Sequence, residues 1–368
     1  MAQLRTSEIA DLESIYHSRD ILRTLDTISD NYRKTICLIP FGSTEEIFSL
    51  FPKKRIPLHA LTVLKQKKER AIYTLEVFHR NGSTLKIKRD FILYKLPGFT
   101  YSYLMICIGN PDFLHRELKS FIKHYHREII LSFIKSHDLI NLLEHYKTKN
   151  NLDEIVITRA SQKIRYLGEK KISSVTWPKS SLEDASRWLD GNDGFFKSLQ
   201  YKALAIGREV SNGFIDRQGA MRIERNFGKA YRYMVLPIVK YLESYIELFK
   251  NRGRRANDLE IRPLEINFKN EIFKEKSSNS DFIGILGILE DTSISVIHGN
   301  PYIHLSIMDY IDGSTCDLWV VNSQQILLVP QLHSTIGSLK RIVNHIYDYY
   351  AEGEIQEHAY KKQTGTTM

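Results

Sequence analysis

Cysteine is scarce in this chain of 368 residues, which contains only Cys37, Cys107 and Cys316. Their number is odd, they lie far apart, and none belongs to a pair with the spacing of a zinc site. The sequence therefore predicts neither a disulfide framework nor a zinc knuckle. A reducing cytoplasm is the compartment that fits this cysteine content.

Long hydrophobic runs are also missing. The longest, residues 99–109 and 282–289, have about half of the ~20 apolar residues that a membrane-spanning helix needs. The N-terminal segment mixes charged and apolar side chains and lacks both the apolar centre and the small-residue cleavage site of a secretory signal. We therefore expect no membrane span and no secretory signal.

The sequence motifs of several common catalytic mechanisms are absent too. We find no glycine-rich phosphate loop, nucleophile elbow, HExxH zinc motif or kinase signature. The sequence therefore predicts no cofactor and no metal. Active sites assembled from distant residues leave no such local pattern, so catalysis stays an open question at this point.

The composition is that of a folded protein, with 42% hydrophobic residues, 26% charged residues and no long polar tract. Its length favours two or three domains. We expect an α+β fold with an N-terminal helix and antiparallel sheet region, a central mixed region with a long helix, and a C-terminal β-meander packed on a helix. The expected ranges are 1–150 with basic hairpins, 151–275, 276–352, and a flexible tail over 353–368.

Periodicity and turn residues place the expected elements. Apolar residues at three- and four-residue steps predict an amphipathic helix from about residue 7 to residue 32. Alternating segments around Asn81-Gly82 predict a β-hairpin, because both turn residues tolerate positive φ. Further turns are expected at Ser211-Asn212-Gly213 and Gln218-Gly219. A long helix is expected over about residues 227–251, kinked or divided at Pro237.

The formal net charge of +9 favours attraction to a polyanion. Many of the cations fall at the ends or on alternating positions of neighbouring expected strands, with Tyr73 and Phe78 between them to stack on bases. The candidate nucleic-acid-binding residues are Lys53, Lys54, Arg55, Lys65, Lys67, Lys68, Arg70, Lys86, Lys88, Arg89, Arg252, Arg254 and Arg255. A further basic set is Lys163, Arg165, Lys170 and Lys171. The alternative is that these cations solubilise the surface or guard strand edges.

A second hypothesis is a metal-dependent nuclease, in which two carboxylates hold the metal and a lysine stabilises charge on the phosphate. Glu144 on an expected helix precedes Asp153 at the start of an expected strand, and Glu169-Lys170-Lys171 follows. This order of helix, strand and strand resembles that of the PD-(D/E)XK nucleases. The resemblance implies Asp153, Glu169 and Lys171 as catalytic residues. The alternative is a chance arrangement of surface charges.

Histidines and aspartates give weaker candidates. His304-Leu305-Ser306 and His333-Ser334-Thr335 have the His-x-Ser/Thr form of paired-histidine phosphoesterases, but their separation is short for that family, and a histidine with satisfied hydrogen bonds in a sheet is the better explanation of His304. His124-Tyr125-His126 has the spacing of two metal ligands on one strand face, or is a surface pair. A cluster of carboxylates near Asp312-Gly313 suits a divalent cation or simply forms a turn. Its members are Asp309, Asp312 and Asp317.

Taken together, these features predict a cytoplasmic nucleic-acid-associated protein, a non-catalytic accessory subunit that works with a protein partner. A basic chain of several domains without a named nucleic-acid module is similar in character to accessory proteins of prokaryotic antiviral systems. Two alternatives stay open. One is a divergent metal-dependent nuclease or phosphodiesterase, and the other is a pure protein-interaction subunit whose positive charge meets an acidic partner.

Overall fold

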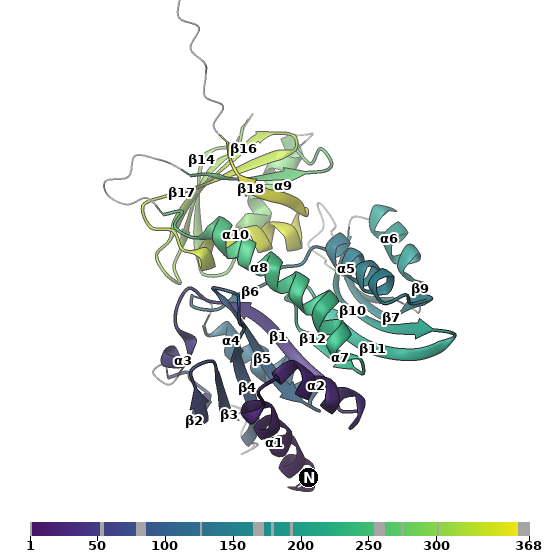
Figure 1. Ribbon diagram of the computed structural model, residues 1–368. Helices are drawn as coiled ribbons and strands as arrows, with labels where there is room; N and C mark the ends of the chain where they lie inside the picture. The colour runs from purple at the N-terminus through teal and green to yellow at the C-terminus, as the bar shows by residue number, and fades with distance from the viewer. Residues whose placement is uncertain are drawn as a thin grey trace, which may run out of the picture. The chain divides into compact units, whose positions relative to one another are not determined.

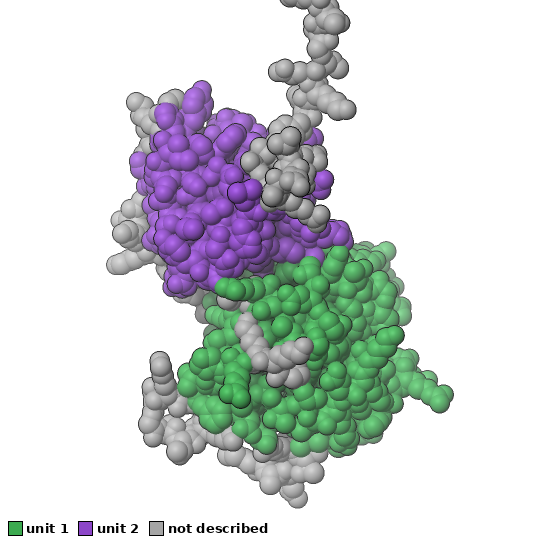
Figure 2. Space-filling view, turned by 90° about the vertical axis from the view of Figure 1, so that its left-hand side faces the viewer, with its two compact units in different colours: residues 1–166, 171–245 green, residues 167–170, 246–368 purple. Residues whose placement is uncertain are grey.

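The structure is a computed structural model, and it divides the chain into two compact units (Figure 2). Unit 1 comprises residues 1–166 and 171–245, and unit 2 comprises residues 167–170 and 246–368. Helices and antiparallel strands are both abundant in each unit, which confirms the expected α+β class (Figure 1). The described residues are 2–51, 55–78, 86–125, 127–164, 173–177, 180–191, 194–253, 262–273, 276–299 and 302–359.

Unit 1 is built on one antiparallel sheet with the strand order β2-β3-β4-β5-β1-β12-β11-β10-β7-β8; β6 pairs with β1, and β9 with β7. Because β12 pairs with β1, the expected ranges 1–150 and 151–275 contribute strands to the same sheet. Its strands are β1 (Ile36–Gly42), β2 (His59–Lys67), β3 (Arg70–Phe78), β4 (Lys86–Lys95), β5 (Ser102–Ile108), β6 (Ile130–Leu131), β7 (Glu154–Ile164), β8 (Ser173–Trp177), β9 (Ser180–Ser181), β10 (Gly194–Ala205), β11 (Arg208–Asp216) and β12 (Met221–Glu224).

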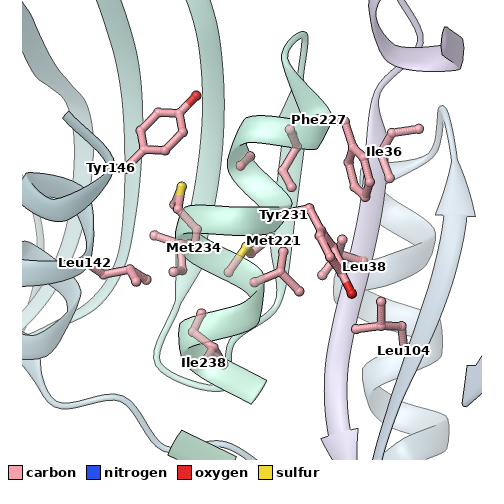
Figure 3. Packing of buried hydrophobic residues seen from close by; sticks show 14 of the residues in the cluster. Ile36, Leu38, Leu104, Leu142, Tyr146, Met221, Phe227, Tyr231, Met234 and Ile238 are labelled. Atoms are coloured by element: carbon pink, nitrogen blue, oxygen red, sulfur yellow. The ribbon is translucent and has the colours of Figure 1, made fainter. Parts of the chain in front are cut away.

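The centre of this sheet is covered on both faces. On one face Ile36 and Leu38 of β1 join an apolar cluster with residues of α1, α2, α5 and the long helix (Figure 3). On the other face Ile39 and Phe41 join a second cluster with residues of α3, η1 and α4. The helices are α1 (Ala2–His17), α2 (Ile21–Asp30), α3 (Ile47–Leu50), the π-helix η1 (Phe113–Leu118), α4 (Lys119–Lys123), α5 (Ser136–Lys149) and α6 (Leu182–Gly191).

The expected long helix is continuous but irregular. It runs from α7 (Phe227–Ala230) through the π-helix η2 (Tyr231–Val235) into α8 (Leu236–Phe249). The helix is not divided at Pro237; a π-helical turn lies just before this residue, which cannot donate the amide hydrogen bond of a regular α-helix. Figure 3 shows Tyr231, Met234 and Ile238 pointing from this helix into the cluster that contains Leu38.

Two local expectations in unit 1 need correction. The expected helix over residues 7–32 is two helices, because Asp20 caps the start of α2 and accepts a hydrogen bond from the Arg23 amide at 3.0 Å. The segment Ser211–Gly213 lies inside β11, and the turn is at Ile206–Gly207. A Cβ at Gly213 would lie 2.6 Å from the Tyr201 hydroxyl, so this glycine permits close packing between strands.

The Asn81-Gly82 turn lies outside the described residues. The two flanking strands, β3 and β4, are antiparallel neighbours from Phe78 opposite Lys86 to Arg70 opposite Tyr94, as the alternating pattern predicts. Gln218-Gly219, by contrast, forms the expected turn between β11 and β12, with Gly219 at a φ of +76°.

Unit 2 has a sheet of order β14-β15-β16-β17-β13-β18. The expected meander is present as β14 to β17, and its following helix α10 buries Leu339, Ile342 and Ile346. Residues 353–357 form the strand β18, which pairs with β13, where the sequence predicted the start of a flexible tail. The segment Gly353–Glu357 is mostly polar, so its sequence does not predict a strand. The elements are β13 (Leu264–Phe268), α9 (Lys276–Leu286), β14 (Thr292–His298), β15 (His304–Asp309), β16 (Thr315–Asn322), β17 (Gln325–Pro330), α10 (Ile336–Tyr349) and β18 (Gly353–Glu357). Among the described residues, no helix combines the length and the apolar character needed to span a membrane.

Candidate nucleic-acid interface

The turn between β2 and β3 lies against the junction of α1 and α2. Arg70 donates a hydrogen bond from Nη1 to the Ser18 carbonyl at 2.7 Å. The Nζ atom of Lys67 lies 4.6 Å from the centre of the Tyr16 ring, within the range of a cation–π interaction. These contacts fix the basic turn on the helices, so its cations keep a defined position.

The helix junction adds cations of its own. Arg19 lies between the two helices and Arg23 lies on the first turn of α2, and both side chains are exposed. The hairpin turn contributes exposed Lys67 and Lys68. We call the resulting surface the basic corner, and define it as Arg19, Arg23, Lys67, Lys68 and Arg70. The neighbouring carboxylates along the same two segments are Asp20 and Glu69, so positive charge is in excess.

Sequence reasoning missed Arg19 and Arg23. Neither belongs to a run of cations, and Arg19 comes beside the β2–β3 turn because Arg70 contacts the adjacent Ser18. The tertiary contact that joins the two segments, from Arg70 to the Ser18 carbonyl, leaves no local pattern in either segment.

Three other basic candidates, Lys65, Lys88 and Arg89, form ion pairs within unit 1. Lys65 lies 2.8 Å from Glu13, Lys88 lies 3.1 Å from Glu76, and Arg89 lies 3.4 Å from Glu8, measured between nitrogen and oxygen. Arg89 is opposite Leu75 in the β3–β4 ladder, whereas Arg70 is opposite Tyr94, so Lys88 and Arg89 lie farther along the strands from the basic corner. Of these pairs, Lys65–Glu13 is exposed on both sides, and an exposed pair contributes only about 0–1 kcal/mol.

The remaining basic candidates do not form one described surface. Arg55 is exposed after α3. Arg252 is buried in unit 2, where Nε donates to the Leu248 carbonyl at 2.6 Å and Nη2 donates to Glu357 at 3.1 Å. This arginine therefore fastens β18 to the end of α8. Lys53, Lys54, Arg165, Lys170, Lys171, Arg254 and Arg255, and the side chains of Lys86 and Lys163, lie outside the described residues.

The expected nuclease residues are only partly described. Asp153 precedes β7 and accepts a hydrogen bond from the Gly207 amide at 3.2 Å, while its own amide donates to the Leu204 carbonyl at 2.9 Å. Asp153 therefore holds the β10–β11 turn. Glu144 lies 4.0 Å from Lys147 on α5. Glu169 and Lys171 lie outside the described residues. Among the residues that the structure describes, no group of three histidine, cysteine or acidic side chains is placed to hold a metal ion.

The three aspartates of unit 2 have separate partners. Asp309 lies 2.7 Å from Arg341, and Asp317 accepts a hydrogen bond from Gln331 at 2.8 Å. Asp312 accepts hydrogen bonds from the Thr335 hydroxyl and the Ser314 amide. Burial would raise the pKa of Asp312, but these hydrogen bonds outweigh it and hold the pKa below its ordinary value. The carboxylates thus fix the β15–β16 turn to the start of α10.

The histidine candidates are also separated by the fold. His304 packs edge-on against Trp319 and lies 3.6 Å from Asp317. A nitrogen of His333, Nε2, lies 3.0 Å from the Asp312 carbonyl oxygen. The ring of His124 lies 5.2 Å from that of His59, and His126 lies outside the described residues.

Sequence reasoning also missed a pocket where β4 and β5 part. The two strands pair only over Ile92–Lys95 and Tyr103–Ile106, and α1 lies across the gap beyond this pairing. The pocket has about 330 Å³ of empty space, counted with the solvent at its mouth. Its lining includes Glu8, Leu12, Arg89, Asp90, Cys107 and Phe113.

The charged groups of this pocket already have partners. Burial raises the pKa of Glu8, and the neighbouring Arg89 guanidinium opposes this shift without cancelling it. Asp90 accepts a hydrogen bond from the Thr74 hydroxyl. The pocket therefore serves first to seat α1 on the sheet.

No protein-family model and no curated protein matches this sequence. The placement of the residues themselves is therefore the basis for a functional proposal.

Proposed function

We propose that unit 1 binds nucleic acid through the basic corner, and that the protein acts as a non-catalytic accessory subunit. The observation that carries this proposal is the packing of the β2–β3 turn on the α1–α2 junction, which gathers cations from two distant segments. A phosphate backbone is bound by spaced cations and needs no particular motif. Because Lys67 and Arg70 are held by Tyr16 and Ser18, less side-chain entropy is lost on binding.

The distribution of charge supports this location. Unit 1 contains 39 lysines and arginines against 26 acidic residues, whereas unit 2 contains 13 against 17. The positive charge of the protein therefore belongs to unit 1, and its long-range field favours the approach of a polyanion to that unit.

The test is a binding titration with labelled single-stranded RNA, single-stranded DNA and duplex DNA at low and moderate salt. The variant replaces Arg19, Arg23 and Lys68 by glutamine, three exposed side chains of the basic corner. We expect affinity to fall at least about tenfold at low salt, with a smaller slope of log affinity against log salt, because fewer counterions are released.

A matched control removes the same number of positive charges from unit 1, at positions outside the basic corner. It replaces Lys149 of α5, Arg208 of β11 and Lys229 of α7, all exposed, by glutamine. This variant should bind within about threefold of the parent, since only the long-range field changes. Equal weakening by both variants would refute a localised interface, and an absence of binding at low salt would refute nucleic-acid binding altogether.

A further inference from the structure

Strand β14 is an open edge of the unit 2 sheet. It stands at the end of the strand order and, within the described residues, pairs only with β15. Its last residues are exposed, with Val296 at 51% and Ile297 at 57% of their full accessible surface. An exposed apolar edge is a template for pairing with another strand.

This edge lacks the charges that guard two other edges of the protein. The edge strand β2 carries Lys65 and Lys67, and the edge strand β18 carries Glu354 and Glu357. Strand β14 has the sequence TSISVIH, without lysine, arginine, proline or an acidic residue. Pairing of β2 or β18 with its own copy would bring like charges together, whereas β14 can pair with itself without that cost.

The backbone of β14 has donors and acceptors directed outward. The Tyr310 amide donates to the Asp291 carbonyl at 2.9 Å, so this pair belongs to the hydrogen-bonded positions of the β14–β15 ladder. Alternation along an antiparallel ladder then assigns Ser293 and Ser295 to hydrogen bonds with β15. The N–H and C=O groups of Thr292, Ile294 and Val296 therefore point away from β15. A β-bulge follows Val296, so the regular open edge is Thr292–Val296.

The charges around β14 favour a second copy in antiparallel orientation. Glu290 and Asp291 lie just before β14 and Asp309 lies opposite Thr292, and the neighbouring cation there is Arg341 of α10, so two parallel edges would still place net acidic ends side by side. Exposed Glu290 and Asp291 precede the strand, and exposed His298 ends it. An antiparallel pair places the acidic end of one copy beside the histidine end of the other, twice by symmetry.

We infer that two copies of this chain associate through β14, antiparallel about a two-fold axis at Ile294. Thr292 of each copy lies opposite Val296 of the other, and Ser293 lies opposite Ser295. The outward backbone groups of Thr292, Ile294 and Val296 then hydrogen-bond across the axis, and the two sheets become one continuous sheet. Association also removes Val296 and Ile297 from water.

The test is sedimentation of the full chain over concentrations from about 1 to about 100 μM, a range that covers weak self-association. We expect a mass near twice the 42.9 kDa of one chain at the upper end. A double variant with Ser293→Lys and Ser295→Lys places lysines opposite each other across the axis. It should weaken association at least about tenfold, because like charges directly opposite are unfavourable.

The matched control is the double variant Ser293→Lys with Ser295→Glu, which changes the same two positions. In the inferred register each new lysine lies opposite a new glutamate, so this variant should associate at least as tightly as the parent. Circular dichroism of all forms checks that the fold is retained. A parent that stays monomeric throughout the range, or a lysine-only variant that associates as tightly as the parent, overturns the proposal. If the lysine–glutamate variant is as weak as the lysine-only variant, the antiparallel register is wrong.

Discussion

The central strands of the two units differ in how many of their faces are buried. All seven residues of β1 in unit 1 are buried, whereas buried and partly exposed residues alternate along β16 in unit 2. The cause is the number of layers, because α-helices and π-helices cover both faces of the unit 1 sheet at β1. The sequences show the same contrast, with ICLIPFG uniformly apolar and TCDLWVVN alternating. A continuous apolar strand indicates a sheet covered on both faces, even when its neighbours are antiparallel.

Truncation of one aromatic residue in each unit tests whether a strand buried on both faces contributes more to stability than a strand buried on one face. Phe41 on β1 is fully buried and stacks on Tyr103 with ring centres 5.3 Å apart. Phe41→Ala should reduce the free energy of unfolding by about 3–5 kcal/mol, because it leaves a cavity between two layers. Trp319→Ala on β16 should cost about 1 kcal/mol or less, since 42% of that side chain is already in water. Denaturant unfolding followed by circular dichroism measures both. Equal losses would mean that the open face of β16 is covered in solution.

Sequence patterns predicted most of the elements because each has a local cause. The meander and α10 follow from alternation and from a 3.6-residue period, and the disturbance before Pro237 follows from proline chemistry. The patterns failed where a distant contact decides the structure. In the sequence Gly213 has the character of a turn residue, but in the structure it is a strand residue that leaves room for the Tyr201 side chain. Residues 353–357 form the strand β18 because they pair with β13.

The candidate interface was predictable only in part, for the same physical reason. Lys67, Lys68 and Arg70 form a visible run, so the sequence identified them. Which cations stay available is decided by their neighbours in space. Glu13 and Glu8 lie on α1, far along the chain from the lysine and arginine that they pair with. The sequences of β2 and β4 alone do not predict that Glu13 and Glu8 are the partners.

A second comparison concerns ion pairs, one in each unit. In unit 2 the Arg252 side chain is 5% exposed and donates hydrogen bonds to Leu248 and Glu357. Arg252→Met should cost about 1–3 kcal/mol, because it removes the hydrogen bonds of a charged donor to the half-buried Leu248 carbonyl and to Glu357. In unit 1 both Lys65 and Glu13 are more than a third exposed, so Lys65→Met should cost about 0–1 kcal/mol.

Thermal unfolding at low and high salt completes this second test. The effect of Lys65→Met should shrink as salt rises, because the pair is accessible to counterions, while the effect of Arg252→Met should change little. A large and salt-insensitive loss for Lys65→Met would show that the β2 strand depends on this contact for its position on α1.

The smallest expected effect is a difference in pH dependence between two carboxylates. Burial raises the pKa of Glu8 in unit 1, so protonation is easier in the folded state and this group adds stability as the pH falls through its raised pKa. Burial also acts on Glu265 in unit 2, but hydrogen bonds from Gln356, His358 and Asn267 outweigh it and lower the pKa. Glu265 therefore contributes stability above its ordinary value near 4.5, and this contribution is lost as the pH falls below that value toward the folded pKa.

Substitution by glutamine, which resembles the protonated acid, separates the two cases. Relative to the parent, Glu265→Gln should be less stable at neutral pH, and the difference should narrow in acid, because the parent loses the ionised form that Gln356 and His358 stabilise. Glu8→Gln should be no less stable than the parent at neutral pH. As the pH falls toward 4.5, the stability of the parent should rise relative to that of Glu8→Gln, because the parent becomes protonated in its folded state. Melting temperatures measured from neutral pH to about pH 3.5 give both curves, a range set by the unperturbed carboxyl pKa. The difference in melting temperature between parent and variant should thus change with pH in opposite directions for the two substitutions. A change in the same direction would mean that the Arg89 guanidinium, and not burial, controls the pKa of Glu8. In that case charge holds α1 on the sheet.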